Sequence, residues 1–344
     1  MKAVLIYDGS SDANTDPQLC QALDIIEDVR DIQAILTKSG YATEIIGFQE
    51  PLLKYVQTLV KAKPDVVFNQ FEGLGTDSSY EMHMASLLDF FGISYTGSGA
   101  AALSLCHHKA TAKSVLNDCG VPTPKHLLIE QNHPVSRKGL EFPLIVKPVH
   151  EDGSIGIDED SVVYDNRALK RKIALVHERF QQPALIEEYI EGREFNVSIL
   201  GNDPFDFVQI REIHFSLELE PKILSFSAKW NKDSAAYQGA VSKPASHLPE
   251  SICRQMTAVA VQCFKIFKMR DYARVDFRMG RSQVPYVIDV NPNPCISRDS
   301  GMAMAAEQNG VNYDELIRKI TAFAGSRIKF SDRARGGVDG SRAS

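Results

Sequence analysis

The sequence places acidic and amide side chains on two short segments of alternating polarity, residues 272–280 and 284–294. The turn between the segments predicts a β-hairpin, and its register puts Asp276 opposite Asp289 on one face. Two opposed carboxylates repel each other unless a cation or a proton lies between them. With Asn291 on the same face, the oxygen ligands favour magnesium over zinc, and magnesium in turn indicates phosphate chemistry.

A second signal is Lys147, which ends the wholly apolar segment PLIVK. A buried ammonium group needs an anionic partner, and a nucleotide phosphate is a suitable one. The loop that follows has two glycines and Ser154, and its backbone amides can bind phosphate oxygens. The alternative is a lysine that extends from the edge of a sheet into solvent.

A third segment, residues 183–197, leads from an apolar strand into a group of carboxylates that includes Glu187, Glu188 and Glu194. Backbone groups at a strand end can hydrogen-bond an adenine edge, and one carboxylate can accept hydrogen bonds from ribose hydroxyls. Taken alone, this segment also fits a solvated acidic turn, just as residues 272–294 fit a solvated hairpin face. The combination of the three signals favours a nucleotide site.

The surrounding elements predict an α/β protein of several domains. Strands and amphipathic helices alternate over residues 1–103, which indicates a parallel sheet. We expect a smaller α/β unit over residues 104–192, a strand-rich unit over 193–330 and a flexible tail over 331–344. The expected helices lie near 19–38, 80–91, 166–180, 250–268, 300–309 and 313–324, and the expected strands include 93–97 and 222–228.

Composition and charge restrict the class of protein. The 344 residues have 38 basic and 44 acidic side chains and a formal net charge of -6, which argues against nucleic acid or an anionic membrane as the main partner. The N-terminal apolar run is too short for a signal peptide, and no segment approaches the ~18 apolar residues of a membrane span. Six scattered cysteines without a C-x-x-C pair suit reduced thiols. We therefore expect a cytoplasmic protein.

One motif supports a different class of protein. The segment YTGSGAAALS, residues 95–104, contains the G-x-G-x-x-A pattern of a dinucleotide-binding turn, which would indicate a dehydrogenase. However, the turn follows several earlier strands, and Asp118 falls within an expected helix instead of ending the next strand. The adjacent His107 and His108 fit helix-end residues better than a metal site, because neighbouring helical side chains diverge.

Taken together, the turn YTGSG with Lys109 downstream, IVKP, the glycine and serine loop, IEEYIEGREF, SAKW, and RVDF followed by IDVNPNP resemble the D-alanine–D-alanine ligases of the ATP-grasp superfamily. The resemblance covers roughly residues 1–325. It implies an ATP-grasp fold of three α/β domains, with ATP between the central and C-terminal domains. It also implies magnesium or manganese as the ion, small-molecule acid and amine substrates, and a homodimer.

The implied reaction transfers the γ-phosphoryl group of ATP to a carboxylate, and an amine then attacks the acyl phosphate. The default product is the dipeptide used in peptidoglycan synthesis. The alternatives are a ligase for another amino acid or specialised metabolite, and a nucleotide-binding module without ligase activity.

The resemblance also implies roles for individual residues. The ATP-binding residues would be Lys109, Lys147, Ser154, Glu187, Glu188, Tyr189, Ile190, Glu194 and Lys229. The metal ligands would be Asp276, Asp289 and Asn291. Charge on the acyl phosphate and on the later oxyanion would be steadied by Arg274, with Lys229 and Ser154 as further catalytic residues.

Two carboxylates differ from the pattern of the family. Asp289 stands where glutamate is common, which shortens one metal ligand. The N-terminal loop has no glutamate to bind the ammonium group of the first amino acid, so Asp12 or Asp16 would have to replace it.

The remaining substrate positions differ further. Trp230 replaces a tyrosine of the mobile loop, and Cys295 replaces a glycine that supplies an oxyanion amide. Ser300 matches a carboxylate-binding serine, but Gly301 follows it in place of leucine. These departures leave the ATP chemistry intact and put the identity of the substrates in question.

Overall fold

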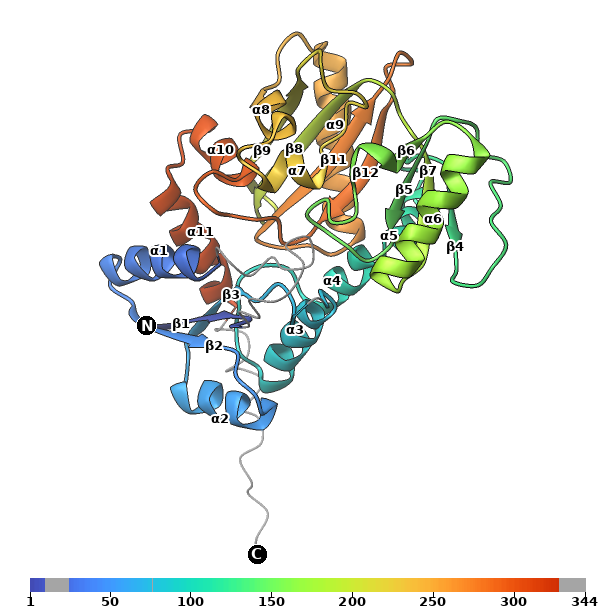
Figure 1. Ribbon diagram of the computed structural model, residues 1–344. Helices are drawn as coiled ribbons and strands as arrows, with labels where there is room; N and C mark the ends of the chain where they lie inside the picture. Colours follow the sequence, from blue (N-terminus) through green and yellow to red (C-terminus); the bar gives the residue numbers. More distant parts are fainter. Residues whose placement is uncertain (10–24, 76, 328–344) are drawn as a thin grey trace, which may run out of the picture.

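The computed structural model describes residues 1–9, 25–75 and 77–327, and these residues form three sheets with helices packed against them (Figure 1). Asp12, Asp16 and the expected tail lie outside the described residues.

The first sheet is parallel, as predicted, with strand order β2-β1-β3. Its central strand β1 is buried on both faces because alternate side chains enter two different cores. Ala3 and Leu5 pack with α1, whereas Val4 and Ile6 pack with α2 and α3. The elements of this region are β1 (Lys2–Tyr7), α1 (Ile25–Lys38), β2 (Ala42–Gly47), α2 (Leu52–Ala62), β3 (Val66–Gln70) and α3 (Tyr80–Phe91).

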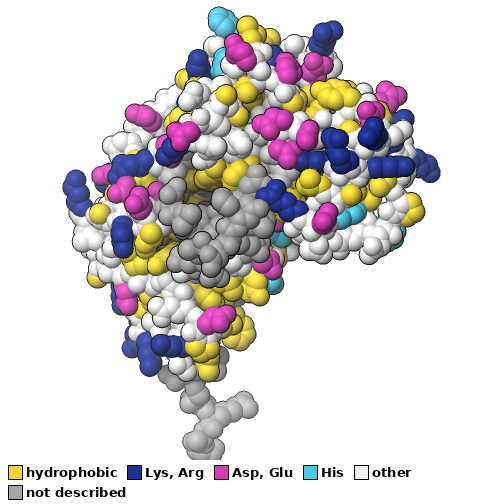
Figure 2. Space-filling model, viewed as in Figure 1, with side chains coloured by type: hydrophobic (Ala, Val, Ile, Leu, Met, Phe, Trp, Pro, Cys, Tyr) yellow, Lys and Arg dark blue, Asp and Glu magenta, His cyan; other side chains and the backbone are white. Residues whose placement is uncertain are grey.

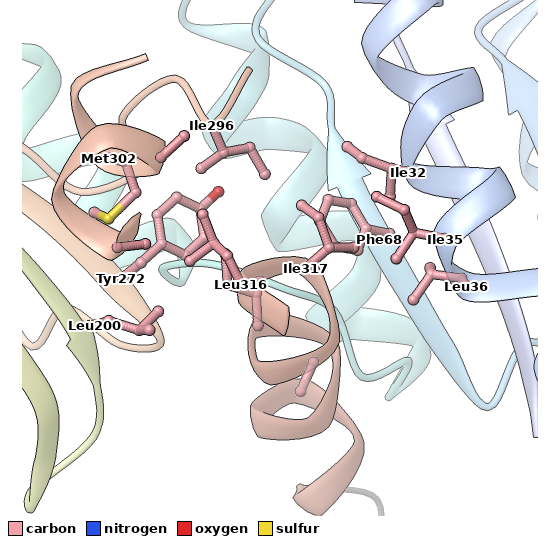
Figure 3. Packing of buried hydrophobic residues seen from close by; sticks show 14 of the residues in the cluster. Ile32, Ile35, Leu36, Phe68, Leu200, Tyr272, Ile296, Met302, Leu316 and Ile317 are labelled. Carbon is pink, nitrogen blue, oxygen red and sulfur yellow. The ribbon is translucent and has the colours of Figure 1, made fainter. Parts of the chain in front are cut away.

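The end of the chain completes the core of this first sheet. Leu316 and Ile317 of α11 (Tyr313–Ser326) belong to the same buried cluster as Phe68 of β3 and Ile32 of α1 (Figure 3). Helix α11 therefore covers one face of a sheet formed by the beginning of the chain. The division at residues 103 and 192 stays a prediction.

The central sheet is antiparallel, with strand order β4-β7-β5-β6. Helix α6 begins where predicted, because the Asp165 side chain accepts hydrogen bonds from the backbone amides of the first turn. The elements are α4 (Ala100–His107), α5 (Lys109–Asp118), β4 (His126–Ile129), β5 (Leu144–Pro148), η1 (Glu159–Ser161), β6 (Val162–Val163), α6 (Asn166–Phe180) and β7 (Ala184–Glu188).

The third sheet is antiparallel, with strand order β10-β9-β8-β11-β12. Its buried strands pack against α9, whose apolar face forms the core of this unit. The elements are β8 (Arg193–Gly201), β9 (Phe205–Phe215), α7 (Phe226–Trp230), α8 (Ala235–Gly239), β10 (Ala240–Pro244), α9 (Glu250–Ile266), β11 (Tyr272–Met279), β12 (Pro285–Asn291) and α10 (Gly301–Gln308).

Two expected strands were wrong. Residues 222–228 do not form a strand, because the Ser225 hydroxyl accepts a hydrogen bond from the Ala228 amide at 3.3 Å and caps helix α7. Residues 93–97 make only an isolated bridge between Tyr95 and Val67. This segment turns away at Gly97, where φ is +84°.

The visible face in Figure 2 carries acidic and basic side chains, and a group of basic side chains lies at its right-hand edge, in the region of α6. Among the described helices, none combines the length and the apolar character that a membrane span requires.

Candidate active site

The hairpin of β11 and β12 has the predicted register. Asp276 pairs with Asp289, and Arg274 pairs with Asn291. The register shifts immediately after Asp276, because Phe277 pairs with Val287. This β-bulge, which the sequence pattern did not predict, leaves the carboxylate pair at the end of the regular ladder.

Asp276 is held by three donors. Arg274 donates from Nε and Nη2 to its two carboxylate oxygens at 2.8 and 2.9 Å. The amides of Asn196 and Asn291 donate to the same carboxylate at 2.6 and 3.1 Å. Asp276 therefore fixes the position of Arg274 and of Asn291 together.

Asp289 is less constrained and lies among lysines. Burial disfavours its charge, but Lys109, Lys147, Lys113 and Lys229 outweigh burial and hold the pKa of Asp289 below its usual value. Its Oδ2 atom lies 4.0 Å from Nζ of Lys109. The carboxylate is therefore ionised and available to a cation or to the charges of a ligand.

The donor set suits a hard divalent cation that a ligand also coordinates. Within the described residues, no group of three or more His, Cys, Asp or Glu side chains could hold a metal by itself. Asp276, Asp289 and Asn291 supply only two carboxylates and an amide. Magnesium commonly takes one or two carboxylates and completes its shell with phosphate oxygens and water, so the residues fit it.

A pocket lies between the central sheet and the third sheet, and most of the expected site residues line it. Residues 104–192 contribute Lys109, Lys147, Ser154, Glu187, Glu188, Tyr189 and Ile190. Residues 193–330 contribute Glu194, Lys229, Asp276, Asp289 and Asn291.

Two buried lysines of the pocket are paired with carboxylates. Lys109 donates to Asp152 at 2.7 Å, and Lys147 lies 2.7 Å from Glu187. Sequence reasoning missed Lys113, which lies 2.9 Å from the same Glu187. The spacing of Lys109 and Lys113 could have indicated it, because residues four apart share one face of a helix.

Arg278 organises the side of the pocket that was expected to hold adenine and ribose. It donates to the backbone oxygen of Ile190 at 2.8 Å and to Glu194 at 2.9 Å. Its guanidinium also lies 4.7 Å from the centre of the Tyr189 ring. Sequence reasoning gave Arg278 no role.

Helix α7 contacts the glycine and serine loop across the mouth of the pocket. Trp230 Nε1 donates to the Gly153 oxygen at 2.9 Å, and Ser154 Oγ donates to the Leu224 oxygen at 2.7 Å. Burial and the nearby Arg274 lower the pKa of Lys229 on the same helix. These contacts hold the segment 224–230 closed against the loop at residues 153 and 154.

We expect Trp230→Phe to weaken this closure, because phenylalanine keeps a ring but cannot donate to Gly153. Loss of one hydrogen bond should raise the fraction of ATP hydrolysed without ligation about 2- to 10-fold. The measurement is the ratio of phosphate to ligated product. An unchanged ratio would exclude a role of this contact in shielding the site from water.

Comparison with known proteins identifies the family. The protein-family model described as D-ala D-ala ligase C-terminus matches residues 115–322. A D-alanine–D-alanine ligase of Syntrophotalea carbinolica is 30% identical over 301 residues, which cover 86% of this chain and 90% of that protein. The chain belongs to the D-alanine–D-alanine ligase family.

A second relative and a solved structure also match the chain. The protein y4sG of Sinorhizobium fredii, which is described as uncharacterized, is 31% identical over 301 residues, 86% of this chain and 87% of that protein. The crystal structure of the Bacillus anthracis D-alanine–D-alanine ligase complexed with ATP matches with a TM-score of 0.75 at 21% identity, over 96% of this chain and 100% of that one. The expected family and the ATP-grasp fold are therefore confirmed.

Family membership excludes the dehydrogenase alternative. The contacts of the YTGSG turn give the physical reason. The Gly97 amide donates to Asp271 at 2.9 Å and the Ser98 amide to Asn293 at 2.7 Å. These amides bind side chains of the third unit and do not face a dinucleotide phosphate. Asp118 ends helix α5, as the sequence predicted.

The two adjacent histidines lie at helix ends, as predicted. His107 is the last residue of α4, and the His108 side chain caps α5 by accepting from the Thr111 amide at 3.1 Å. His107 stacks on His150 with ring centres 4.9 Å apart. Burial lowers the pKa of both stacked rings, that of His150 to about 4, so this pair is neutral near pH 7.

Among the expected substrate positions that the structure describes, Cys295, Ser300 and Gly301 do not line this pocket. The Ser300 hydroxyl caps α10 by accepting from the Ala303 amide at 3.2 Å. Among the described residues, a Cβ atom at Gly301 would meet no heavy atom within 4 Å, so a larger side chain has space there. Cys295 is exposed among the described residues, and its Sγ atom lies 3.1 Å from Ser297 Oγ.

Asn293 connects the loop after β12 to the first unit. Sequence reasoning missed this connection. Its Nδ2 atom donates to Glu81 at 2.8 Å, and its Oδ1 atom accepts from Ser98. The close approach requires Gly97, because a Cβ atom there would lie 2.5 Å from Asn293 Oδ1. The repeated N-P of the segment IDVNPNP was the available signal.

Glu81 should make stability depend on pH. Burial raises its pKa from 4.5 to about 8, with the Asn293 bond opposing the shift. The unfolded chain ionises first, so this contribution to the free energy of unfolding decreases as the pH rises from about 4.5 to about 8. Glu81→Gln cannot ionise, and should gain stability relative to wild type across that window. Urea denaturation at about pH 5 and about pH 9 tests this; a stability difference that is equal at both values contradicts it.

Proposed function

We propose that the protein is an ATP- and magnesium-dependent ligase that joins a carboxylate to an amine through an acyl phosphate, with the D-alanine dipeptide as the default product. The observation that carries the proposal is the arrangement of Lys109, Lys147 and Lys229 around the carboxylate pair of β11 and β12. Cations on three elements facing paired carboxylates suit a polyphosphate with its metal ion.

Adenine fits the remaining part of the pocket. Glu187 is 1% exposed, and its Oε1 atom has no hydrogen-bond donor among the described residues, because the Lys113 contact is an ion pair without hydrogen-bond geometry. A buried acceptor of this kind can receive the amino group of adenine. Guanine presents a carbonyl oxygen at that position, so ATP should be preferred over GTP.

The chain's own residues would carry out the chemistry in defined roles. Lys109, Lys147 and Lys229 would bind the phosphates, and Arg274 would steady the charge on the acyl phosphate and on the oxyanion that forms from it. Ser154 would help to hold the loop under the phosphates. Magnesium or manganese bound by Asp276, Asp289 and Asn291 would neutralise charge on the transferred phosphoryl group.

A ligase for a larger or different substrate is the second candidate. The open space at Gly301 beside Ser300 favours it, as does the thiol of Cys295 where the family has a glycine. Asp12 stays a proposal for the ammonium-binding residue. A homodimer and a cytoplasmic location also belong to the proposal.

The test is magnesium-dependent phosphate release from ATP with D-alanine, with L-amino acids and with no amino acid, followed by mass spectrometry of the products. Stimulation by D-alanine with dipeptide formation supports the default product. Stimulation by another acid and amine supports the second candidate. Tight ATP binding without ADP release across a broad panel would show a nucleotide-binding module and contradict a ligase.

A further inference from the structure

Lys113, a buried lysine with no role in the function proposed above, lies behind the nucleotide pocket. It is 3% exposed, one turn after Lys109 on α5. Its Nζ atom donates to Thr123 Oγ1 at 3.1 Å and to the Ile288 oxygen at 3.2 Å, and lies 2.9 Å from Glu187 Oε1. These three groups surround the ammonium, and Lys113 is not among the residues that line the pocket, so it does not bind a phosphate itself.

Two of the three partners of Lys113 lie on strands that form the site. The Ile288 oxygen precedes Asp289 on β12, and Glu187 lies near the end of β7. The second oxygen of Glu187 lies 2.7 Å from Nζ of Lys147 on β5. Lys113 thus connects the proposed adenine strand, a proposed phosphate lysine and the strand of a proposed metal ligand.

The group formed by Lys113, Glu187 and Lys147 contains more positive than negative side chains. One buried carboxylate, Glu187, faces two buried lysines, and the pKa of Glu187 is held below its usual value by both lysines against the effect of burial. The three side chains together carry one net positive charge. Without Lys113, Glu187 and Lys147 would form a neutral pair, and Lys147 would have to leave this carboxylate to bind a nucleotide.

We propose that Lys113 is a positioning residue of the ATP site, which neutralises Glu187 so that Lys147 can bind the nucleotide and which holds β12 beside it. The proposal rests on the proposed function, because it assumes ATP in this pocket. A purely structural lysine would affect stability and leave the nucleotide affinity of the folded protein unchanged.

The chain offers a matched control in Lys172. Lys172 lies on α6, is also 3% exposed and donates to Asp158 at 2.6 Å. Neither residue lines the pocket. Lys113→Met and Lys172→Met each remove one buried ammonium from a carboxylate. Both should lower the thermal unfolding midpoint.

The experiment is calorimetric titration of each folded variant with ATP in the presence of magnesium. Lys113→Met should weaken ATP binding about 10- to 100-fold, the range found when a group that orients a ligand-binding residue is removed. Lys172→Met should stay within about twofold of wild type, since it shares no partner with the site. Equal losses in the two variants, or wild-type affinity in Lys113→Met, would overturn the proposal.

A double variant tests whether Lys113 acts through Glu187. In Lys113→Met, the added change Glu187→Gln removes the carboxylate that pairs with Lys147 and so frees Lys147. The double variant should therefore bind ATP more tightly than Lys113→Met alone, a rescue that a structural role does not produce. Absence of rescue would overturn the proposal, whereas absence of ATP binding by the wild type would overturn it together with the proposed function.

Discussion

Asp289→Asn is expected to lower the rate of magnesium-dependent ADP formation by about 10³-fold, because an amide cannot neutralise a divalent cation opposite Asp276. The folded state should be retained. Within the described residues, the Asp289 carboxylate accepts a hydrogen bond only from the adjacent Val290 amide, at 3.1 Å. Removal of one of two opposed carboxylates also relieves repulsion in the absence of metal.

The measurement is ADP formation at saturating ATP over a magnesium titration, with circular dichroism as the check of folding. Asp206→Asn is the matched control, because Asp206 lies on β9 in an ion pair with Lys319 at 2.8 Å and away from the pocket lining. Asp276→Asn should lose activity equally but also lose stability, since Asp276 holds Arg274. Wild-type turnover in Asp289→Asn would refute the metal assignment.

Arg274→Lys should lower kcat about 10²- to 10³-fold and leave the KM for ATP within about threefold of wild type. Partial burial disfavours the charge of Arg274, but Asp276 outweighs this effect and raises the pKa of the guanidinium. Its planar group can bind Asp276 with one edge and present its remaining N–H groups to developing negative charge. Lysine keeps the charge but cannot reproduce this geometry.

Steady-state kinetics with separate determination of kcat and KM tests this expectation. Arg254→Lys, on the exposed face of α9, is the matched control. A large increase in the KM for ATP at unchanged kcat would instead make Arg274 a residue of ground-state nucleotide binding.

The hairpin register was predictable because strand alternation and turn length leave few pairings, and the structure confirms it. The bulge after Asp276 was not, because it depends on how β12 meets its neighbours in the sheet and in the preceding linker. The contacts of Arg278 were beyond the sequence for a related reason. Its acceptors include the backbone oxygens of Ile190 and Lys222, and backbone atoms leave no pattern in residue types.

Segment 222–228 shows a limit of periodicity. Its apolar residues suit a strand, but Ser225 can satisfy a helix N-terminus with its own hydroxyl, and this local bond decides the outcome. The amphipathic pattern of α11 predicted the helix correctly, but amphipathicity does not identify the partner of its apolar face.

The packing of α11 against the first sheet has a consequence for biosynthesis. Domains usually fold as they leave the ribosome, beginning with the N-terminal one. Here α1 covers only part of one face of the first sheet, and the rest of this core stays open until residues 313–326 have been synthesised, because Leu316 and Ile317 complete it. The strands of this sheet therefore emerge well before the helix that completes their core, and in the interval the nascent chain must keep an apolar sheet surface from aggregating.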